Sequence, residues 1–365
     1  MARDPLQTKI CEMLGIEFPI FAFTHCKDVA AAVSNAGGLG VLGMGGSSPE
    51  EIRAEMRWLR DRCGDRPFGL DLIFPASVPE TAMNREQISV AITDEHRDFA
   101  RRYMEKHNLK EVPPRAGEDR EMGPGGGFAS HENARQQVEV AIEEAPAVIV
   151  AGLGSPAFFL DAAHEKGIKV GGLIGRVRQA QREIDAGVDF VIAQGYDGGG
   201  HTGDVGTFTL VPRVVSIAGD TPVLCAGGVG TGRHLAAALC MGAAGTWSGT
   251  LFLATRESDT DIMVKEKIIA STEEDTIRSR SWSGKPMRQL RNEWNLAWED
   301  PSAPIVHARG TPTMGHPSAW IRRASGQRTR GEHQGSTSHS QQSGRDRMTH
   351  MPWCRQHGPS RPPPS

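Results

Sequence analysis

Short apolar runs alternate with helical segments through most of this 365-residue chain. That alternation is typical of parallel strands joined by crossover helices. The runs are apolar on both faces, so we expect helices to cover the outside of the sheet and side chains to fill its inside. Eight strands are predicted, at residues 18–23, 40–44, 68–74, 147–153, 169–174, 190–194, 222–226 and 245–251.

The segments between these strands have the patterns and end signals of helices. Several stop at a glycine, where a left-handed residue ends a helix without steric strain. Helices are predicted at residues 28–35, 49–63, 130–144, 156–166, 176–186, 209–217, 231–241 and 261–270. Eight such units in roughly 250 residues predict an α/β fold of the (β/α)8 TIM-barrel type, with the active site at the carboxyl ends of the strands.

A doubly wound open sheet is the main competing fold. Two GxGxxG strings, at residues 38–43 and 198–203, could be taken for the fingerprint of a dinucleotide site. That fingerprint must follow a strand and open a helix. The first string precedes or forms a strand, and the second is followed by Asp204-Val205-Gly206 rather than by a helix. We therefore favour the barrel.

Two segments interrupt the pattern. Residues 76–130, after the third strand, are far longer than an ordinary βα loop, and we expect a lid-like insertion with a helix near residues 94–107. From residue 301 onward the aliphatic side chains of Val, Leu and Ile are limited to Ile305, Val306 and Ile321. Residues 301–365 are therefore predicted to form a disordered, atypical tail, for which a shifted reading frame or a truncated gene is a further explanation. The catalytic barrel domain is expected to span residues 1–298.

Charge and hydropathy exclude several classes of protein. The formal net charge of -3 argues against a dedicated binder of nucleic acid or of anionic membranes. No apolar run approaches the roughly 20 residues that span a bilayer, and the first residues lack the apolar stretch of a signal peptide, so a cytoplasmic location is expected. The six cysteines include no CxxC pair and are expected to be reduced.

A glycine-dense turn follows the sixth strand and carries a histidine. Residues 194–203 read Gln-Gly-Tyr-Asp-Gly-Gly-Gly-His-Thr-Gly. Glycines permit positive φ and the close approach of a flat ligand, and an imidazole with a pKa of about 6.5 can exchange a proton at neutral pH. We interpret His201 as a base presented at the mouth of the barrel. The alternative is a turn histidine that bonds a backbone carbonyl.

Two further glycine-rich turns follow the seventh and eighth strands. The first contains Gly227 and Gly228, and the second begins Ser248-Gly249-Thr250. Turns at these two places in a barrel often bind a phosphate through backbone N–H groups and a helix N-terminus. The alternative is that the glycines only permit tight turns and close packing of helices.

Several of these segments, in their order along the chain, resemble the nitronate monooxygenases, formerly called 2-nitropropane dioxygenases. The resemblance lies in residues 18–20, 30–40, 193–195, 199–203, 226–229 and 249–255, and it covers most of residues 10–298. It implies an FMN-dependent oxidoreductase that oxidises alkyl nitronates or nitroalkanes with O₂ to a carbonyl compound and nitrite. His201 matches the catalytic histidine of the family, which acts as a base on neutral nitroalkanes or holds the anionic nitronate.

The resemblance also implies where FMN would lie. Its phosphate would lie on Gly227, Gly228, Gly249 and Thr250, next to Ser248. The ring would have Gln194 and Gly195 beside it, Gly200 in the histidine turn, and the backbone of Ala22, Phe23 and Thr24 at its far edge. Asp71 would place a carboxyl group, which only accepts hydrogen bonds when it is ionised, beside the flavin where the family commonly has an asparagine. The partners implied are the small-molecule substrate and O₂, with a homodimer left open.

The end of the first strand departs from the family, which usually reads Gln-Ala-Pro-Met there. His25, Cys26 and Asp28 at this place could be read as metal ligands. Because no fourth ligand has the required spacing, no metal is expected. We expect His25 to line the pocket and Cys26 to pack.

Two other functions stay open. A flavin-dependent enoyl reductase of the type II kind has a similar Gly-Gly-His turn and barrel, but takes hydride from NAD(P)H. The third hypothesis is a barrel that binds flavin but catalyses neither nitronate oxidation nor enoyl reduction.

Overall fold

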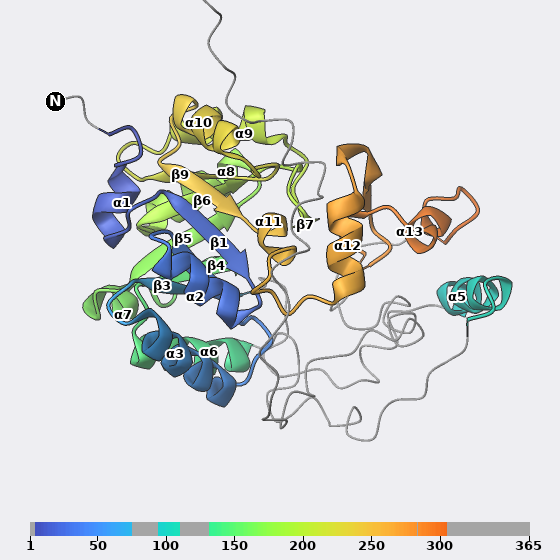
Figure 1. Cartoon of the computed structure of the whole chain (residues 1–365), viewed down its shortest axis with the longest axis horizontal. Helices are drawn as coiled ribbons and strands as arrows, with labels where there is room; N and C mark the ends of the chain where they lie inside the picture. Colours follow the sequence, from blue (N-terminus) through green and yellow to red (C-terminus); the bar gives the residue numbers. More distant parts are fainter. Residues whose placement is uncertain (1–3, 75–93, 110–130, 283, 305–365) are drawn as a thin grey trace, which may run out of the picture. The chain divides into compact units, whose positions relative to one another are not determined.

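Eight parallel strands close into a barrel in a computed structural model of the chain (Figure 1). The structure describes residues 4–74, 94–109, 131–282 and 284–304. The strand order is β1-β2-β3-β4-β5-β6-β8-β9, and β9 pairs with β1. The prediction of a TIM barrel is therefore confirmed. The barrel strands are β1 (Ile20–Thr24), β2 (Leu39–Gly43), β3 (Phe68–Ile73), β4 (Val148–Leu153), β5 (Lys169–Ile174), β6 (Phe190–Gln194), β8 (Val223–Ala226) and β9 (Gly245–Ser248).

The barrel has two apolar layers because its strands are apolar on both faces. Alternate residues point inward and pack on one another, as Phe21 does against Phe190 and Trp247. The other residues point outward against the helices, among them Leu70 of β3, Ile149 of β4 and Val191 of β6. This double burial is what a parallel sheet requires, and it explains why each strand reads as a continuous apolar run.

Helices cover the outside of the barrel (Figure 1). Those that contact the sheet include α2 on β1 and β2, α8 on β5 and β6, and α9 on β6 and β8. The helices are α1 (Lys9–Leu14), α2 (Lys27–Asn35), α3 (Pro49–Cys63), α5 (Asp94–Lys106), α6 (His131–Glu144), α7 (Leu160–Glu165), α8 (Val177–Ala186), α9 (Thr207–Val215), α10 (Gly232–Cys240), α11 (Thr250–Leu253), α12 (Ile262–Ala270) and α13 (Glu293–Trp298).

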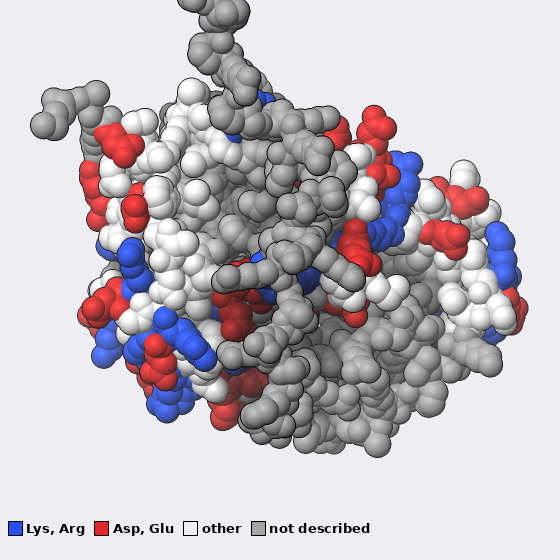
Figure 2. All heavy atoms as spheres, viewed as in Figure 1, with Lys and Arg blue, Asp and Glu red and all other residues white. Residues whose placement is uncertain are grey.

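Glu144 at the end of α6 links that helix to α3. Its buried carboxylate lies 3.1 Å from the guanidinium nitrogens of both Arg57 and Arg60, and Arg53 lies 3.5 Å away. Burial opposes ionisation of Glu144, but the hydrogen bonds and charges of these arginines outweigh it, so the net effect lowers its pKa. Figure 2 shows basic and acidic side chains intermixed over these two helices.

The end of the last barrel strand differs from the prediction. The strand was expected to run to residue 251, but β9 ends at Ser248 and the short helix α11 follows. The pairing of β9 with β1 stops at Ala22 and Ser248, so no neighbour holds the next residues extended. A short apolar run does not by itself distinguish a helix from a strand.

A second, three-stranded sheet was not predicted. It consists of β10 (Thr276–Ser279), β11 (Met287–Leu290) and β7 (Gly200–His201), in the order β10-β11-β7, and a 3-10 helix, η1 (Glu273–Asp275), precedes it. All its pairings are antiparallel, with Met287 opposite His201. The segment after the barrel is thereby attached to the histidine turn that follows β6.

The expected insertion and tail fall largely outside the described residues. Of the insertion, helix α5 is described, and it packs Ala100 against Trp294 and Trp298 of α13. The expected helix at 94–107 is thus present, while the lid and the tail at 305–365 lie outside the described residues and stay predictions. Across the described part of the chain, no helix has the length and apolar character needed to cross a bilayer.

Candidate active site

The carboxyl ends of the barrel strands form a mouth that is more open than the barrel interior. Inward side chains deep in the barrel, such as Val41, Val150 and Ile192, are fully buried. Those one step nearer the carboxyl ends, including Phe23 on β1 and Gln194 on β6, are only half-buried. A ligand could therefore approach the barrel from this end, which is where TIM-barrel enzymes have their active sites.

The predicted ring-contacting residues of β1 and β6 lie at this mouth. Ala22 and Thr24 are buried on the outer face of β1, so it is their backbone that can face a ligand. Phe23 points inward and stacks on Trp247, with ring centroids 5.7 Å apart. On β6, Gln194 pairs with Ala226 of β8 and its amide lies against Gly198 of the following turn.

Gly195 begins the turn after β6 because no side chain would fit there. A Cβ on Gly195 would lie 2.2 Å from both the backbone nitrogen and the hydroxyl of Thr207, the first residue of α9. Thr207 lies 3.0 Å from the carbonyl oxygen of Gly227 and 3.3 Å from that of Ala226, to which its hydroxyl can donate. Its own N–H donates to Asp197 at 2.8 Å. Thr207 thus joins the turns that follow β6 and β8.

The predicted phosphate residues come together in space. Gly227 and Gly228 both have positive φ, at 98° and 75°. The hydroxyl of Ser248 donates to the carbonyl of Val229 at 3.0 Å, which joins the turn after β8 to β9. Gly249 lies beside Phe23, and a Cβ on Gly199 would lie 2.6 Å from the hydroxyl of Thr250.

His201 lies on β7, at the side of the mouth formed by the turn after β6. Gly200 before it has a φ of 84°, a conformation that favours glycine. Nδ1 of His201 lies 3.4 Å from the carbonyl oxygen of Pro286, just before β11. The residue as a whole is exposed to solvent, but the protein packed around its ring lowers the pKa of His201 from its usual 6.5 by desolvation. The Pro286 carbonyl acts in the opposite direction, and the charge of Lys285 lowers the pKa further. The lowered pKa favours the neutral imidazole at pH 7.

Asp71 lies on the inner face of β3, and the sequence left its ionisation open. Its side chain is only 4% exposed. Burial raises the pKa of this carboxyl well above its usual 3.8. The raised pKa favours the protonated carboxyl, which both donates and accepts a hydrogen bond, over the carboxylate, which only accepts.

His25 and Cys26 take the positions expected of them only in part. Cys26 is buried, as expected, and its thiol lies 3.3 Å from the carbonyl oxygen of Glu257. His25 is exposed, but Nδ1 is 2.9 Å from the carbonyl of Gly43 and the ring packs edge-on against Phe23. Across the described part of the chain, no three His, Cys, Asp or Glu side chains gather as metal ligands do.

Sequence reasoning missed the arginines that support the histidine turn. Arg288 of β11 donates to the carbonyl of Tyr196 at 3.0 Å, and Arg278 of β10 donates to that of Gly203 at the same distance. Arg278 also binds Asp204 at 2.8 Å. These arginines lie more than 70 residues after the turn, so no local pattern could have paired them with it.

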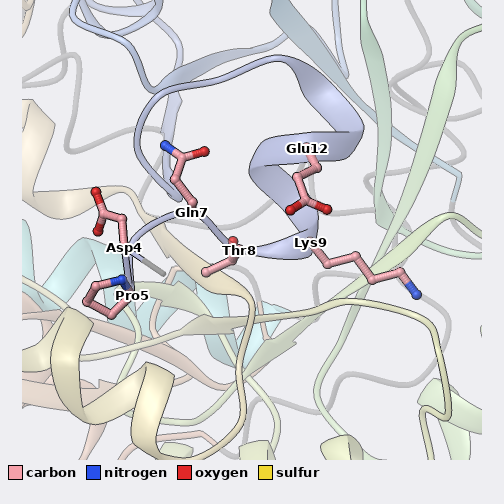
Figure 3. A pocket seen from close by; sticks show the side chains of 6 residues that line it. All are labelled: Asp4, Pro5, Gln7, Thr8, Lys9 and Glu12. Atoms are coloured by element: carbon pink, nitrogen blue, oxygen red, sulfur yellow. The ribbon is translucent and has the colours of Figure 1, made fainter. Parts of the chain in front are cut away.

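A surface hollow beside α1 lies at the other end of the barrel (Figure 3). Thr8, in its lining, donates to the carbonyl of Ala244, which directly precedes β9. Lys9 lies 3.5 Å from the carboxylate of Asp220, shortly before β8. Both contacts are at the amino ends of strands. Residues at this face of a TIM barrel contribute to stability rather than to catalysis, so the hollow is separate from the candidate site. It is lined by Asp4, Pro5, Gln7, Thr8, Lys9 and Glu12.

Sequence comparisons identify similar proteins. The family model described as nitronate monooxygenase matches residues 7–356 of this chain. A candidate monooxygenase of Mycobacterium tuberculosis is 40% identical over 303 residues, which cover 82% of this chain and 80% of that protein. A Staphylococcus saprophyticus protein named as a probable nitronate monooxygenase is 29% identical over 306 residues, covering 79% of this chain and 80% of that protein.

Solved structures of other proteins superpose on this chain. A nitroalkane oxidase from Streptomyces ansochromogenes superposes with a TM-score of 0.68 at 25% identity, covering 87% of each chain. FabK from Thermotoga maritima superposes with a TM-score of 0.61 at 30% identity, covering 82% of this chain and 80% of that one.

Proposed function

This chain belongs to the nitronate monooxygenase family, and we propose that it binds FMN and oxidises alkyl nitronates or neutral nitroalkanes with O₂ to a carbonyl compound and nitrite. The observation that carries the proposal is the meeting of three turns at the mouth of the barrel. The histidine turn, the Gly227-Gly228 turn and the start of α11 are joined there through Thr207, Val229 and Thr250.

The turns after β8 and β9 fit the phosphate of FMN. Backbone at positive φ, as in Gly227 and Gly228, is a common way for a turn to point N–H groups at an anion. The N–H groups of Gly228 and Gly249 donate to no group within the described ranges. Near Gly228, a Cβ would meet only the side chain of Asp197 within 4 Å, at 3.3 Å, which leaves room on its other side. We assign the phosphate to Gly227, Gly228, Ser248, Gly249 and Thr250.

The ring would lie across the mouth, between β1 and the turn after β6. Strand β1 offers the backbone of residues 22–24, and the far side offers Gln194, Gly195 and Gly200. Asp71 would face the ring from β3. Bound FMN would supply the redox chemistry, and the protein would orient the substrate and control its protonation.

His201 would remove the proton from a neutral nitroalkane. The hydrogen on the carbon next to a nitro group is acidic, because the nitro group takes up the negative charge, so a base that is neutral near pH 7 suffices. The lowered pKa of His201 keeps its imidazole in that form. For a substrate that arrives as the nitronate, the same side chain would hold the anion in place.

Two assays on the purified protein test this proposal. We expect flavin absorbance bands that a nitronate bleaches without O₂ and that O₂ restores, with nitrite formed in step with O₂ consumed. An enoyl reductase would instead oxidise NAD(P)H in the presence of an enoyl thioester. A colourless protein that also fails to bind added FMN would refute the proposal, and turnover of the thioester alone would favour the reductase.

A further inference from the structure

A carboxyl group that has no partner in the described part of the chain lies inside the barrel. Asp71 is on the inner face of β3, directly opposite Gly43 of β2 and Val150 of β4. Its side chain is almost completely buried. Among the described residues, no hydrogen-bond donor and no charged group contributes to its pKa. Buried carboxyl groups in proteins are normally satisfied, so this one calls for an explanation.

The neighbouring strands offer this carboxyl space rather than partners. Both of its oxygens lie over Gly152 of β4, 2.5 and 2.7 Å from where a Cβ on that glycine would be. On the other side, the space above Gly43 is filled by the rings of Phe23 and His25. His25 is thus the titratable side chain on that flank, and its Nδ1 is engaged with the Gly43 carbonyl. The remaining open direction is the mouth of the barrel.

Burial acts on the ionisation of this group without opposition from a neighbouring charge. It raises the pKa of Asp71, and no charged side chain contributes to the shift. An ionised carboxylate in such surroundings has little contact with solvent and no cation among the described residues to stabilise it, so the neutral form is favoured. A protonated carboxyl then has an O–H group that requires an acceptor.

We propose that Asp71 is a neutral carboxylic acid that donates its hydrogen bond to the flavin ring bound at the mouth of the barrel. This inference rests on the proposed function. The acid then forms hydrogen bonds as an amide side chain would, since both groups have a hydrogen-bond donor and a hydrogen-bond acceptor. It also places no negative charge beside the ring, so the flavin stays easier to reduce than it would be beside a carboxylate.

The first test asks whether the acid is neutral in the protein as purified. Infrared spectra at pH 7 should contain a protonated-carboxyl band that disappears in Asp71→Asn. Asp189→Asn is the matched control. Burial opposes ionisation of Asp189, but hydrogen bonds from Val170, Lys169 and His164 outweigh it and lower its pKa, so that variant should keep the band. Absence of the band from the unaltered protein would overturn the proposal.

The second test asks whether the acid donates to the flavin. Asn keeps a neutral donor, so Asp71→Asn should bind FMN within about twofold of the unaltered protein and leave its reduction potential nearly unchanged. Asp71→Leu has no donor and should bind FMN roughly fivefold more weakly. If Asp71 were ionised, Asn would instead tighten FMN binding and raise the potential, which overturns the proposal.

The remaining outcomes separate this inference from the proposed function. Equal FMN binding by the Asn and Leu variants would refute the donation while leaving the flavoenzyme intact. Failure of the unaltered protein to bind FMN would refute both the donation and the proposed function.

Discussion

Replacing Thr207 with valine should loosen the connection between the histidine turn and the proposed phosphate turn. The two side chains have nearly the same shape, but valine has no hydroxyl. The threonine hydroxyl has one hydrogen and can donate to one carbonyl at a time, and the Gly227 carbonyl at 3.0 Å is the nearer of its two acceptors. Thr207→Val therefore removes one hydrogen bond.

The magnitude follows from where that bond lies. A hydrogen bond between neutral groups contributes about 1 kcal/mol net, and a buried acceptor left without a donor adds to the loss. Because Gly227 is half-buried, water can replace part of the interaction. We expect a loss of about 1–2 kcal/mol, which corresponds to a melting temperature lower by roughly 2–5 °C. If the Gly227-Gly228 turn holds the phosphate, FMN affinity should fall by up to about tenfold.

Thermal melting and a fluorescence titration with FMN measure both effects. Thr207→Ser is the control, because it keeps the hydroxyl and loses only a methyl group; its FMN affinity should stay within about twofold of the original. Thr207→Val with unchanged melting and unchanged affinity would show that the bond does not hold the turn. Equal loss of affinity in the serine and valine variants would show that the hydroxyl is not responsible.

Three further predictions concern other parts of the molecule. Gly228→Val should lower the FMN content of the purified protein severalfold, since valine disfavours a φ of 75°. Gly230→Val in the same turn should retain FMN, because no positive φ is required there. Equal FMN content in the two variants would refute the placement of the phosphate. His201→Asn should lower kcat/KM on neutral nitroalkanes about 10²–10⁴-fold and on preformed nitronates much less. The rate of the unaltered enzyme on nitroalkanes should fall as the pH drops through the lowered pKa of His201, below 6.5, because protonation removes the base. Glu144→Gln should destabilise the fold by about 1–2 kcal/mol at pH 7, measured by denaturant unfolding, while Glu143→Gln at the more exposed neighbouring pair should change it by less than about 0.5. Because the folded-state pKa of Glu144 is lowered, its contribution is present above about pH 4.5 and is lost as pH falls through the lowered value; a difference between the variants that persists in acid would contradict this.

The barrel could be predicted because each strand is recognisable from its own apolar residues. A parallel strand covered on both faces must be apolar throughout, so the runs at β5 and β6 match the structure residue for residue. The ends of strands are less certain, because they depend on neighbours. Thr250 and Leu251 have the composition of a strand, but they form α11 once pairing with β1 has ended at Ser248.

The sequence by itself determined the TIM barrel and the kinds of residue at its mouth. Apolar runs, glycine-rich turns and the histidine that follows the sixth strand are local features that can be recognised without the structure. Only the tertiary structure decided what those residues contact and in which direction burial shifts their pKa values. His201 meets the Pro286 carbonyl through a sheet formed with residues more than 80 positions away, and no local pattern encodes that pairing. The pKa of Asp71 is raised because the fold buries it among strands that offer no cation, and burial is a property of the assembled barrel rather than of one strand.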